Sequence, residues 1–125
     1  VGNELFKESL KKIGINYVFD YYGMIEQTGS IFIECSQGFL HCSDYSEVII
    51  RNSQTLQPLA VNQEGIIQVL SLLPTSYPGN SLLTEDLGMI VGEDDCKCGK
   101  KGKYFVMSGR MKESEIRGCG DTRVI

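Results

Sequence analysis

The sequence contains no long apolar run, no block of charge of one sign and no internal repeat. No stretch reaches the roughly 18 consecutive apolar residues that a membrane-spanning helix needs. The 12 Lys and Arg against 16 Asp and Glu give a formal charge of −4, which disfavours a nucleic-acid partner. The lysines near residues 100–103 lack the spelling of a Walker phosphate loop. We therefore expect neither a membrane span nor a nucleic-acid partner.

Five cysteines are present, an odd number at uneven spacing. This pattern does not suit a framework of paired disulfides, which small secreted domains use. Metal or thiol chemistry in a reducing compartment fits it better. The cysteines therefore predict a cytoplasmic protein.

At 125 residues the chain is the size of one small domain, and its pattern is mostly β. Apolar residues at helical spacing predict one helix over residues 3–13, which Gly14 ends, and residues 15–19 read as a short strand. The rest consists of short β runs separated by turn residues, as expected of an antiparallel meander or small open barrel. These runs are residues 31–35, 39–43, 47–52, 65–73, 81–91 and 104–108. The predicted fold class is α+β, mostly β.

A lone helix and strand ahead of an all-β sequence is unusual for an independent fold, because such a unit normally belongs to a larger α/β sheet. We expect residues 1–29 to end an α/β part and residues 30–125 to form a β-rich subdomain. The chain also begins with Val1 rather than Met. The expectation is a C-terminal portion of a larger protein, inactive by itself, whose exposed apolar surface favours a homodimer.

Four residues with metal-binding side chains fall in two pairs. Cys35 and His41 flank a predicted turn at residues 36–38, and Cys96 and Cys98 lie one residue apart. Zinc in structural sites takes four tetrahedral nitrogen and sulfur ligands, which this set would supply. The sequence therefore predicts a closed, structural zinc site, with ordinary buried or surface thiols as the alternative.

Cys42 follows His41 directly. On a strand the two side chains would point to opposite faces, so Cys42 is expected to be a small core residue. It is the substitute ligand if one of the four is misassigned.

Three short motifs occur in a meaningful order along the chain. They are Tyr22-Gly23-Met24-Ile25-Glu26, then residues 83–88 with the spelling LTEDLG, then residues 109–112 (GRMK) with residues 116–118 (IRG). Together they resemble the late motifs YGxTE, TGD and GRxxxxIKxxG of the acyl-activating, adenylate-forming enzymes. The spelling is most similar to the LuxE-type acyl-protein synthetases, with phenylacetate-CoA ligases as close relatives. The resemblance implies that the chain belongs to an adenylation domain.

The resemblance implies roles for four residues of the first two motifs. Glu26 would lie near Mg²⁺, and Tyr22 and Gly23 would line the region of the adenine and the acyl carboxylate. Asp86 would accept hydrogen bonds from the ribose hydroxyls. Taken singly, the carboxylates would read as solvated surface groups and the tyrosine as core.

The third motif adds two basic residues. By resemblance Arg110 lies near the nucleotide, and Lys112 falls where the hinge to a mobile C-terminal domain begins. Two positions depart from the family pattern: Ile25 replaces a Thr and removes a hydroxyl beside the nucleotide phosphate, and Glu85 replaces a Gly.

Cys119 lies near the end of the sequence, between Gly118 and Gly120. LuxE-type synthetases carry the acyl group on a cysteine close to the C-terminus, so the resemblance implies that Cys119 is the acyl acceptor. The neighbouring cations Arg117 and Arg123 would favour a nucleophilic thiolate. An idle thiol is the alternative.

The implied reaction converts a fatty acid or other carboxylic acid and ATP into acyl-AMP, then transfers the acyl group to a protein cysteine and on to an acyl-reductase partner. Two alternatives stay open. One is an acyl- or aryl-CoA ligase, which shares the adenylation motifs. The other is a non-enzymatic, zinc-stabilised β module that binds a protein partner.

Overall fold

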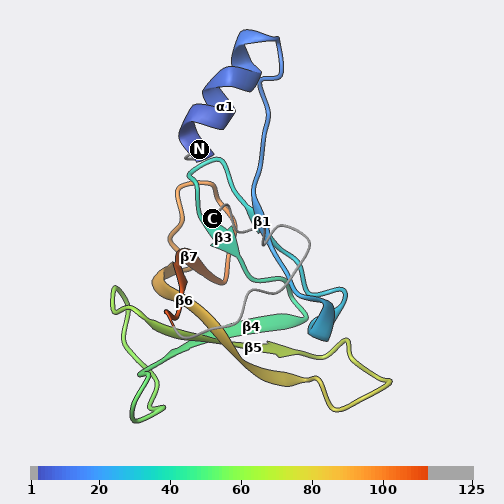
Figure 1. Ribbon diagram of the computed structural model, residues 1–125, viewed down its shortest axis with the longest axis vertical. Helices are drawn as coiled ribbons and strands as arrows, with labels where there is room; N and C mark the ends of the chain where they lie inside the picture. The colour runs from blue at the N-terminus through green and yellow to red at the C-terminus, as the bar shows by residue number, and fades with distance from the viewer. Residues whose placement is uncertain (1–2, 113–125) are drawn as a thin grey trace.

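The regular secondary structure is mostly β-strand in a computed structural model that describes residues 3–112 (Figure 1). None of the described helices combines the length and the apolar character needed to cross a membrane. The elements in chain order are α1 (Asn3–Lys12), β1 (Tyr21–Tyr22), the 3-10 helix η1 (Ile25–Gln27), β2 (Phe32–Glu34), β3 (Leu40–His41), β4 (Ser46–Arg51), β5 (Gly65–Ser71), β6 (Ser81–Glu93) and β7 (Lys103–Arg110).

All strands of the described residues belong to one antiparallel sheet in the order β1-β2-β3-β7-β6-β5-β4. Strands β4 to β7 form one meander and β1 to β3 a second, shorter one. The two meanders join where β3 pairs with β7, through the pairs Leu40↔Phe105 and His41↔Tyr104. The predicted α+β, mostly β fold with an antiparallel meander is therefore confirmed.

The core lies on the inner side of this curled sheet. Buried residues alternate with half-buried ones from Glu47 to Arg51 on β4 and from Ile67 to Ser71 on β5, as the two-residue period of a strand requires. Three aromatic rings, Tyr22, Phe32 and Phe105, contact one another with centroid separations of 5.4–6.3 Å. The residues of the core cluster are Tyr22, Phe32, Leu40, Val48, Ile50, Ile67, Val69, Ile90 and Phe105.

The segment between β1 and β2 closes the curl of the sheet by docking on β5. Gln27 is 1% exposed, and its side-chain amide donates to the carbonyl oxygen of Gly79 at 2.9 Å. The buried hydroxyl of Ser30 donates to the hydroxyl of Ser71 on β5 at 2.7 Å. These polar contacts bring β1, at one edge of the sheet, close to the other half of the sheet.

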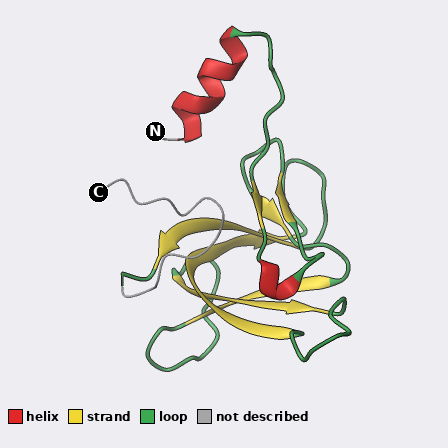
Figure 2. Ribbon diagram, turned by 45° about the vertical axis from the view of Figure 1, so that its right-hand side comes forward, coloured by secondary structure: helices red, strands yellow, loops and turns green. Residues whose placement is uncertain are grey.

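Helix α1 stands away from the sheet at the end of an extended segment (Figure 2). Gly14 ends the helix with a φ of +89°, the left-handed conformation that glycine adopts readily. The predicted strand at residues 15–19 is wrong, since no strand is formed there and the first one is β1. The alternation of apolar side chains is real, but no described strand lies alongside to pair with this segment, and Ile15, Tyr17 and Phe19 are exposed.

A charge cluster fastens α1 to the sheet. The Lys7 ammonium lies 2.6 Å from the Glu34 carboxylate on β2 and 3.6 Å from that of Asp20. The hydrogen bond to Glu34 raises the pKa of Lys7 despite its burial. Burial alone would raise the pKa of Glu34, but hydrogen bonds from Lys7 and from the Asp20 amide outweigh it and lower this pKa.

We expect this attachment to have two pH limits. A lowered carboxyl pKa stabilises the docked helix above the unfolded value of 4.5, and this is lost as the pH falls through the folded pKa. A raised lysine pKa stabilises it below 10.5 and is lost as the pH rises through the folded value. Protection of the α1 amides from hydrogen exchange, relative to the intrinsic exchange rate at each pH, should therefore be greatest between these limits. Glu34→Gln should remove the acidic limit, and an unchanged acid profile in that variant would contradict the assignment.

Candidate functional site

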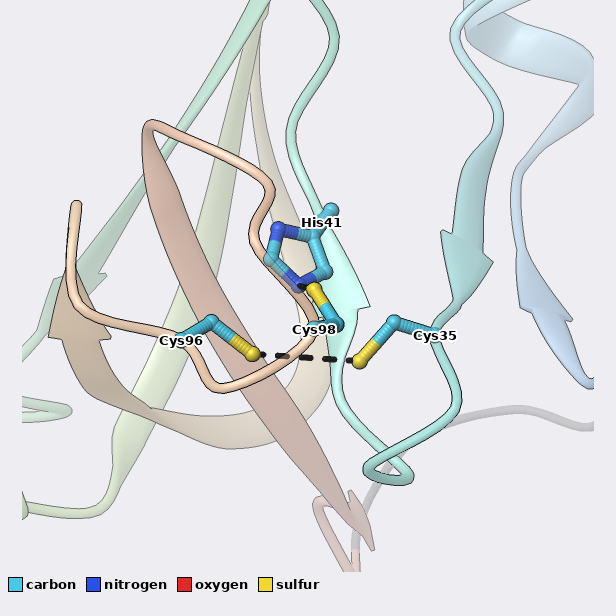
Figure 3. A group of neighbouring side chains, drawn as sticks. All are labelled: Cys35, His41, Cys96 and Cys98. Carbon is cyan, nitrogen blue, oxygen red and sulfur yellow. Dashed lines mark hydrogen bonds between the residues drawn. The ribbon is translucent and has the colours of Figure 1, made fainter.

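Four side chains with metal-binding atoms converge beside the β3–β7 pairing (Figure 3). Cys35 and His41 come from the β2–β3 hairpin, whose turn contains Gly38 with a φ of +82°. Cys96 and Cys98 come from the connection between β6 and β7. Because β3 pairs with β7, the two hairpins lie side by side and their ligand atoms meet, all within 4.8 Å of one another.

The distances fit a tetrahedral metal. Bond lengths of about 2.3 Å to sulfur and about 2.0 Å to nitrogen at tetrahedral angles put two sulfurs about 3.8 Å apart, and sulfur and nitrogen about 3.5 Å apart. The Sγ atoms of Cys35 and Cys96 are 3.9 Å apart, and Cys98 Sγ lies 3.4 Å from His41 Nε2. The cluster can therefore bind a metal ion without rearrangement of these pairs.

The electrostatics of the cluster favour a cation between the four ligand atoms. Burial, followed by the charge of Lys100, lowers the pKa of His41 and keeps its imidazole in the neutral, metal-binding form. Burial alone would raise the pKa of Cys35, but backbone amides of Phe39 and Gln37 donate to its sulfur and lower it. Burial and the neighbouring thiols raise the pKa of Cys96. A bound cation would offset the repulsion between neighbouring thiolates that raises this pKa.

Cys42 does not belong to this cluster. Its Sγ lies 3.9 Å from the Glu47 carboxylate, and burial together with that carboxylate raises its pKa to about 12. The side chain is half-buried and packs against the core, as predicted. Cys42 is not needed as a substitute ligand, because the four predicted residues already form the group.

A second feature is a pocket of about 760 Å³ between β1 with η1 and the strands β6 and β7. All five residues that the sequence marks for nucleotide or Mg²⁺ line this pocket, although they come from three separate segments of the chain. They are Tyr22, Gly23, Glu26, Asp86 and Arg110.

Asp86 is the most constrained carboxylate of the pocket. Its Oδ2 accepts a hydrogen bond from the Tyr22 hydroxyl at 2.7 Å, and its Oδ1 accepts one from Arg110 Nε at 3.1 Å. Its backbone amide donates to the Thr84 hydroxyl at 3.1 Å, which fixes the main chain on the same strand. Burial, followed by the bond to Asp86, raises the pKa of Tyr22, so its hydroxyl stays protonated.

Two further carboxylates line the pocket, among mostly apolar and uncharged residues. Glu26 on η1 and Glu85 on β6 are both exposed and both line it. Ile25, which stands where the family pattern has a Thr, is 84% exposed and presents only carbon to the pocket. This wall offers carboxylate oxygens of the kind that Mg²⁺ prefers.

Lys112 and Cys119 are the remaining predicted site residues. Lys112 is exposed and is not part of the pocket lining, although Met111 beside it donates its amide to the Glu85 carbonyl oxygen at 2.9 Å. Cys119 lies outside the described residues.

The buried polar contacts of Gln27, Ser30 and Ser71 were not expected from the sequence. They hold η1, and with it Glu26, against β5 and the connection that follows it. The run Glu26-Gln27-Thr28-Gly29-Ser30 is polar throughout, so nothing in its pattern distinguishes the two buried members from a solvated loop.

The described residues thus define a β-sheet domain with a carboxylate-bearing pocket and a separate cluster of three cysteines and one histidine. The family model described as "Acyl-protein synthetase, LuxE" matches residues 2–124, so the chain belongs to this family of ligases. No curated protein matches it.

Proposed function

We propose that the pocket binds the adenosine nucleotide of an acyl-activating reaction. In this reaction a fatty acid or other carboxylic acid attacks the α-phosphate of ATP, giving acyl-AMP and pyrophosphate. One observation carries the proposal: Glu26, Asp86 and Arg110, marked by three separate motifs, line one pocket. Membership of the acyl-protein synthetase family supports the same chemistry.

The side chains suit these roles physically. Asp86 has a carboxylate held in place by two donors and can accept hydrogen bonds from ribose hydroxyls. Arg110 adds a cation beside it, suited to a nucleotide anion. Glu26 would help to hold Mg²⁺, which binds through one or two carboxylates and the substrate phosphates and offsets their charge.

We further propose that the Cys35, His41, Cys96 and Cys98 cluster binds zinc in a structural role. Four protein ligands complete a tetrahedral shell and leave no position for a substrate. The separation of these residues from the pocket lining supports stabilisation rather than catalysis.

In the second half of the proposed reaction, the Cys119 thiolate attacks the acyl carbonyl and releases AMP, which leaves the acyl group as a thioester on the protein. An acyl-reductase partner would then take this group, and Lys112 would belong to the hinge that precedes the thiol.

We also retain a homodimer as a proposal. Exposed apolar side chains of α1 and the following segment support it, including Phe6, Tyr17 and Phe19.

The nucleotide proposal is tested by the binding of AMP to the purified chain, measured by calorimetry. Asp86→Asn should weaken AMP binding about tenfold, because hydrogen bonds to a charged acceptor are stronger than those to a neutral one. Asp94→Asn is the matched control, since it removes the same charge outside the pocket and keeps an oxygen to accept from the Gly102 amide. Equal affinity in all three proteins would count against the proposal.

A further inference from the structure

His41 lacks, within residues 3–112, the hydrogen bond that normally orients a metal-binding histidine. Its imidazole is 5% exposed, and Nε2 is the ring nitrogen that lies 3.4 Å from Cys98 Sγ. The other ring nitrogen, Nδ1, is buried and has no hydrogen-bond partner among these residues. Histidines that bind metals almost always donate this second N–H to a carboxylate or a carbonyl oxygen, which fixes the plane of the ring. The orientation of the His41 ring must therefore come from packing.

Tyr104 supplies that packing. His41 on β3 is paired with Tyr104 on β7, and cross-strand partners have their side chains on the same face of a sheet. The two rings stack with a centroid separation of 5.6 Å and an angle of 24° between their planes. Tyr104 is 7% exposed, and its ring also contacts that of Phe39 at 5.1 Å. The last torsion of a histidine is broad, so a buried and nearly parallel neighbour is what restricts the direction of Nε2.

The hydroxyl of Tyr104 reaches the other half of the cluster. It donates to Asp95 Oδ1 at 2.9 Å, and Asp95 directly precedes Cys96. Gly92 on β6 leaves room for this contact, because a methyl group there would lie 2.5 Å from the Tyr104 hydroxyl oxygen and 2.6 Å from Asp95 Oδ1. One side chain thus packs on His41 in the first ligand-bearing hairpin and holds the segment before Cys96 in the second.

We propose that Tyr104 is a positioning residue of the metal site. Its ring sets the plane of the His41 imidazole, and its hydroxyl fixes the approach of the chain to Cys96. The inference rests on the proposed zinc site and adds to it a residue that gives no atom to the metal. Residues that orient ligands in this way typically change metal affinity by about tenfold or more when they are replaced.

The test measures zinc affinity of the full chain by competition with a chelator, and ligand geometry by the visible absorption of the Co²⁺-substituted protein. Tyr104→Leu removes the ring and the hydroxyl and should weaken zinc binding about tenfold. Tyr104→Phe keeps the ring and loses only the bond to Asp95, so it should weaken binding by no more than about threefold. The Co²⁺ bands should shift in Tyr104→Leu, because the imidazole can turn, and stay near their wild-type positions in Tyr104→Phe.

Phe105→Leu is the matched control. Phe105 follows Tyr104 on β7 and points to the opposite face, where its fully buried ring packs against Tyr22 and Phe32. This variant loses an aromatic ring from the same strand at a cost to folding that is at least as large. Its zinc affinity and Co²⁺ spectrum should nevertheless equal those of the wild type. Thermal unfolding checks that each variant is folded at the temperature of the titration.

Gly92→Ala is an independent variant that keeps Tyr104 and all four ligands. Its methyl group would displace the Tyr104 hydroxyl from Asp95, so zinc binding should weaken at least as much as in Tyr104→Phe. Where Tyr104→Leu does not fold, Gly92→Ala takes its place in the comparison, and an unchanged affinity and spectrum would overturn the role of Tyr104.

The outcomes separate the inference from the zinc site on which it rests. A wild type that binds neither zinc nor Co²⁺ overturns both. A wild type that binds zinc, together with a Tyr104→Leu variant of equal affinity and unshifted spectrum, overturns the role of Tyr104 and leaves the zinc site standing. A loss of affinity in Phe105→Leu as large as that in Tyr104→Leu would show a general effect on the fold and would also overturn this role.

Discussion

The purified chain should contain about one zinc ion per molecule, and Cys98→Ser should lose it. Removing one thiolate leaves three ligands and an incomplete tetrahedral shell at a cluster in which the Cys35–Cys96 and His41–Cys98 separations suit the metal. Because binding to a preformed structural site adds directly to folding stability, we expect the loss to cost several kcal/mol. Elemental analysis and thermal unfolding measure the two effects.

The reason for the large effect lies in the topology around the cluster. The two meanders join through only two residue pairs of β3 and β7. Cys35 and Cys96, separated by 61 positions, would be connected through the ion beside this junction. Zinc would therefore reinforce a junction between the two meanders that has few backbone hydrogen bonds of its own.

Cys42→Ser is the control for this prediction, because its sulfur lies outside the cluster and contacts Glu47 instead. It should retain zinc and lose little stability. The assignment would be wrong if the wild type contained no zinc, or if both variants bound it equally well.

The second large effect is expected for Gly88→Ala in β6. A methyl group at this position would lie 2.5 Å from the carbonyl oxygen of Val106 and 2.8 Å from Cδ1 of Ile67. Neither the backbone of β7 nor the buried side chain of β5 has room to move, so we expect a loss of about 3 kcal/mol. For a chain of this length this corresponds to a fall of about 10 °C in the unfolding temperature.

The same substitution should also weaken AMP binding. The register between β6 and β7 shifts at Leu87 and Gly88, directly after Asp86, so displacement of the strand here would move that carboxylate. Gly23→Ala is the control for stability, since its methyl group would lie 3.5 Å from the nearest atom, the Ser30 carbonyl oxygen. An unfolding temperature for Gly88→Ala equal to that of Gly23→Ala would contradict the packing argument.

The sequence predicted the strands from β2 to β7 because each is a short β run with turn residues on both sides. It failed at residues 15–19, where the same alternation of apolar residues is present but a partner strand is not among the described residues. Alternation reports which residues share a face, whereas strand formation also requires a neighbour to accept the hydrogen bonds.

For the candidate sites, sequence reasoning found the ligands but not their supports. Cys35, His41, Cys96 and Cys98 were chosen by spacing, and the structure brings them together. The bond between Tyr22 and Asp86 could not be predicted, because it depends on how the edge strand β1 meets β6 across the curled sheet. No local pattern records a contact across 64 positions of the chain.

That contact also has a kinetic consequence. The hairpins of β4 to β7 form from neighbouring parts of the chain, whereas Tyr22 and Asp86 meet only after a loop of 64 positions has closed. Closing a loop of this length costs entropy before any contact repays it, so such contacts tend to form late. We therefore expect the pocket to mature last during refolding, after the meander is in place, so that recovery of AMP binding lags behind recovery of β structure.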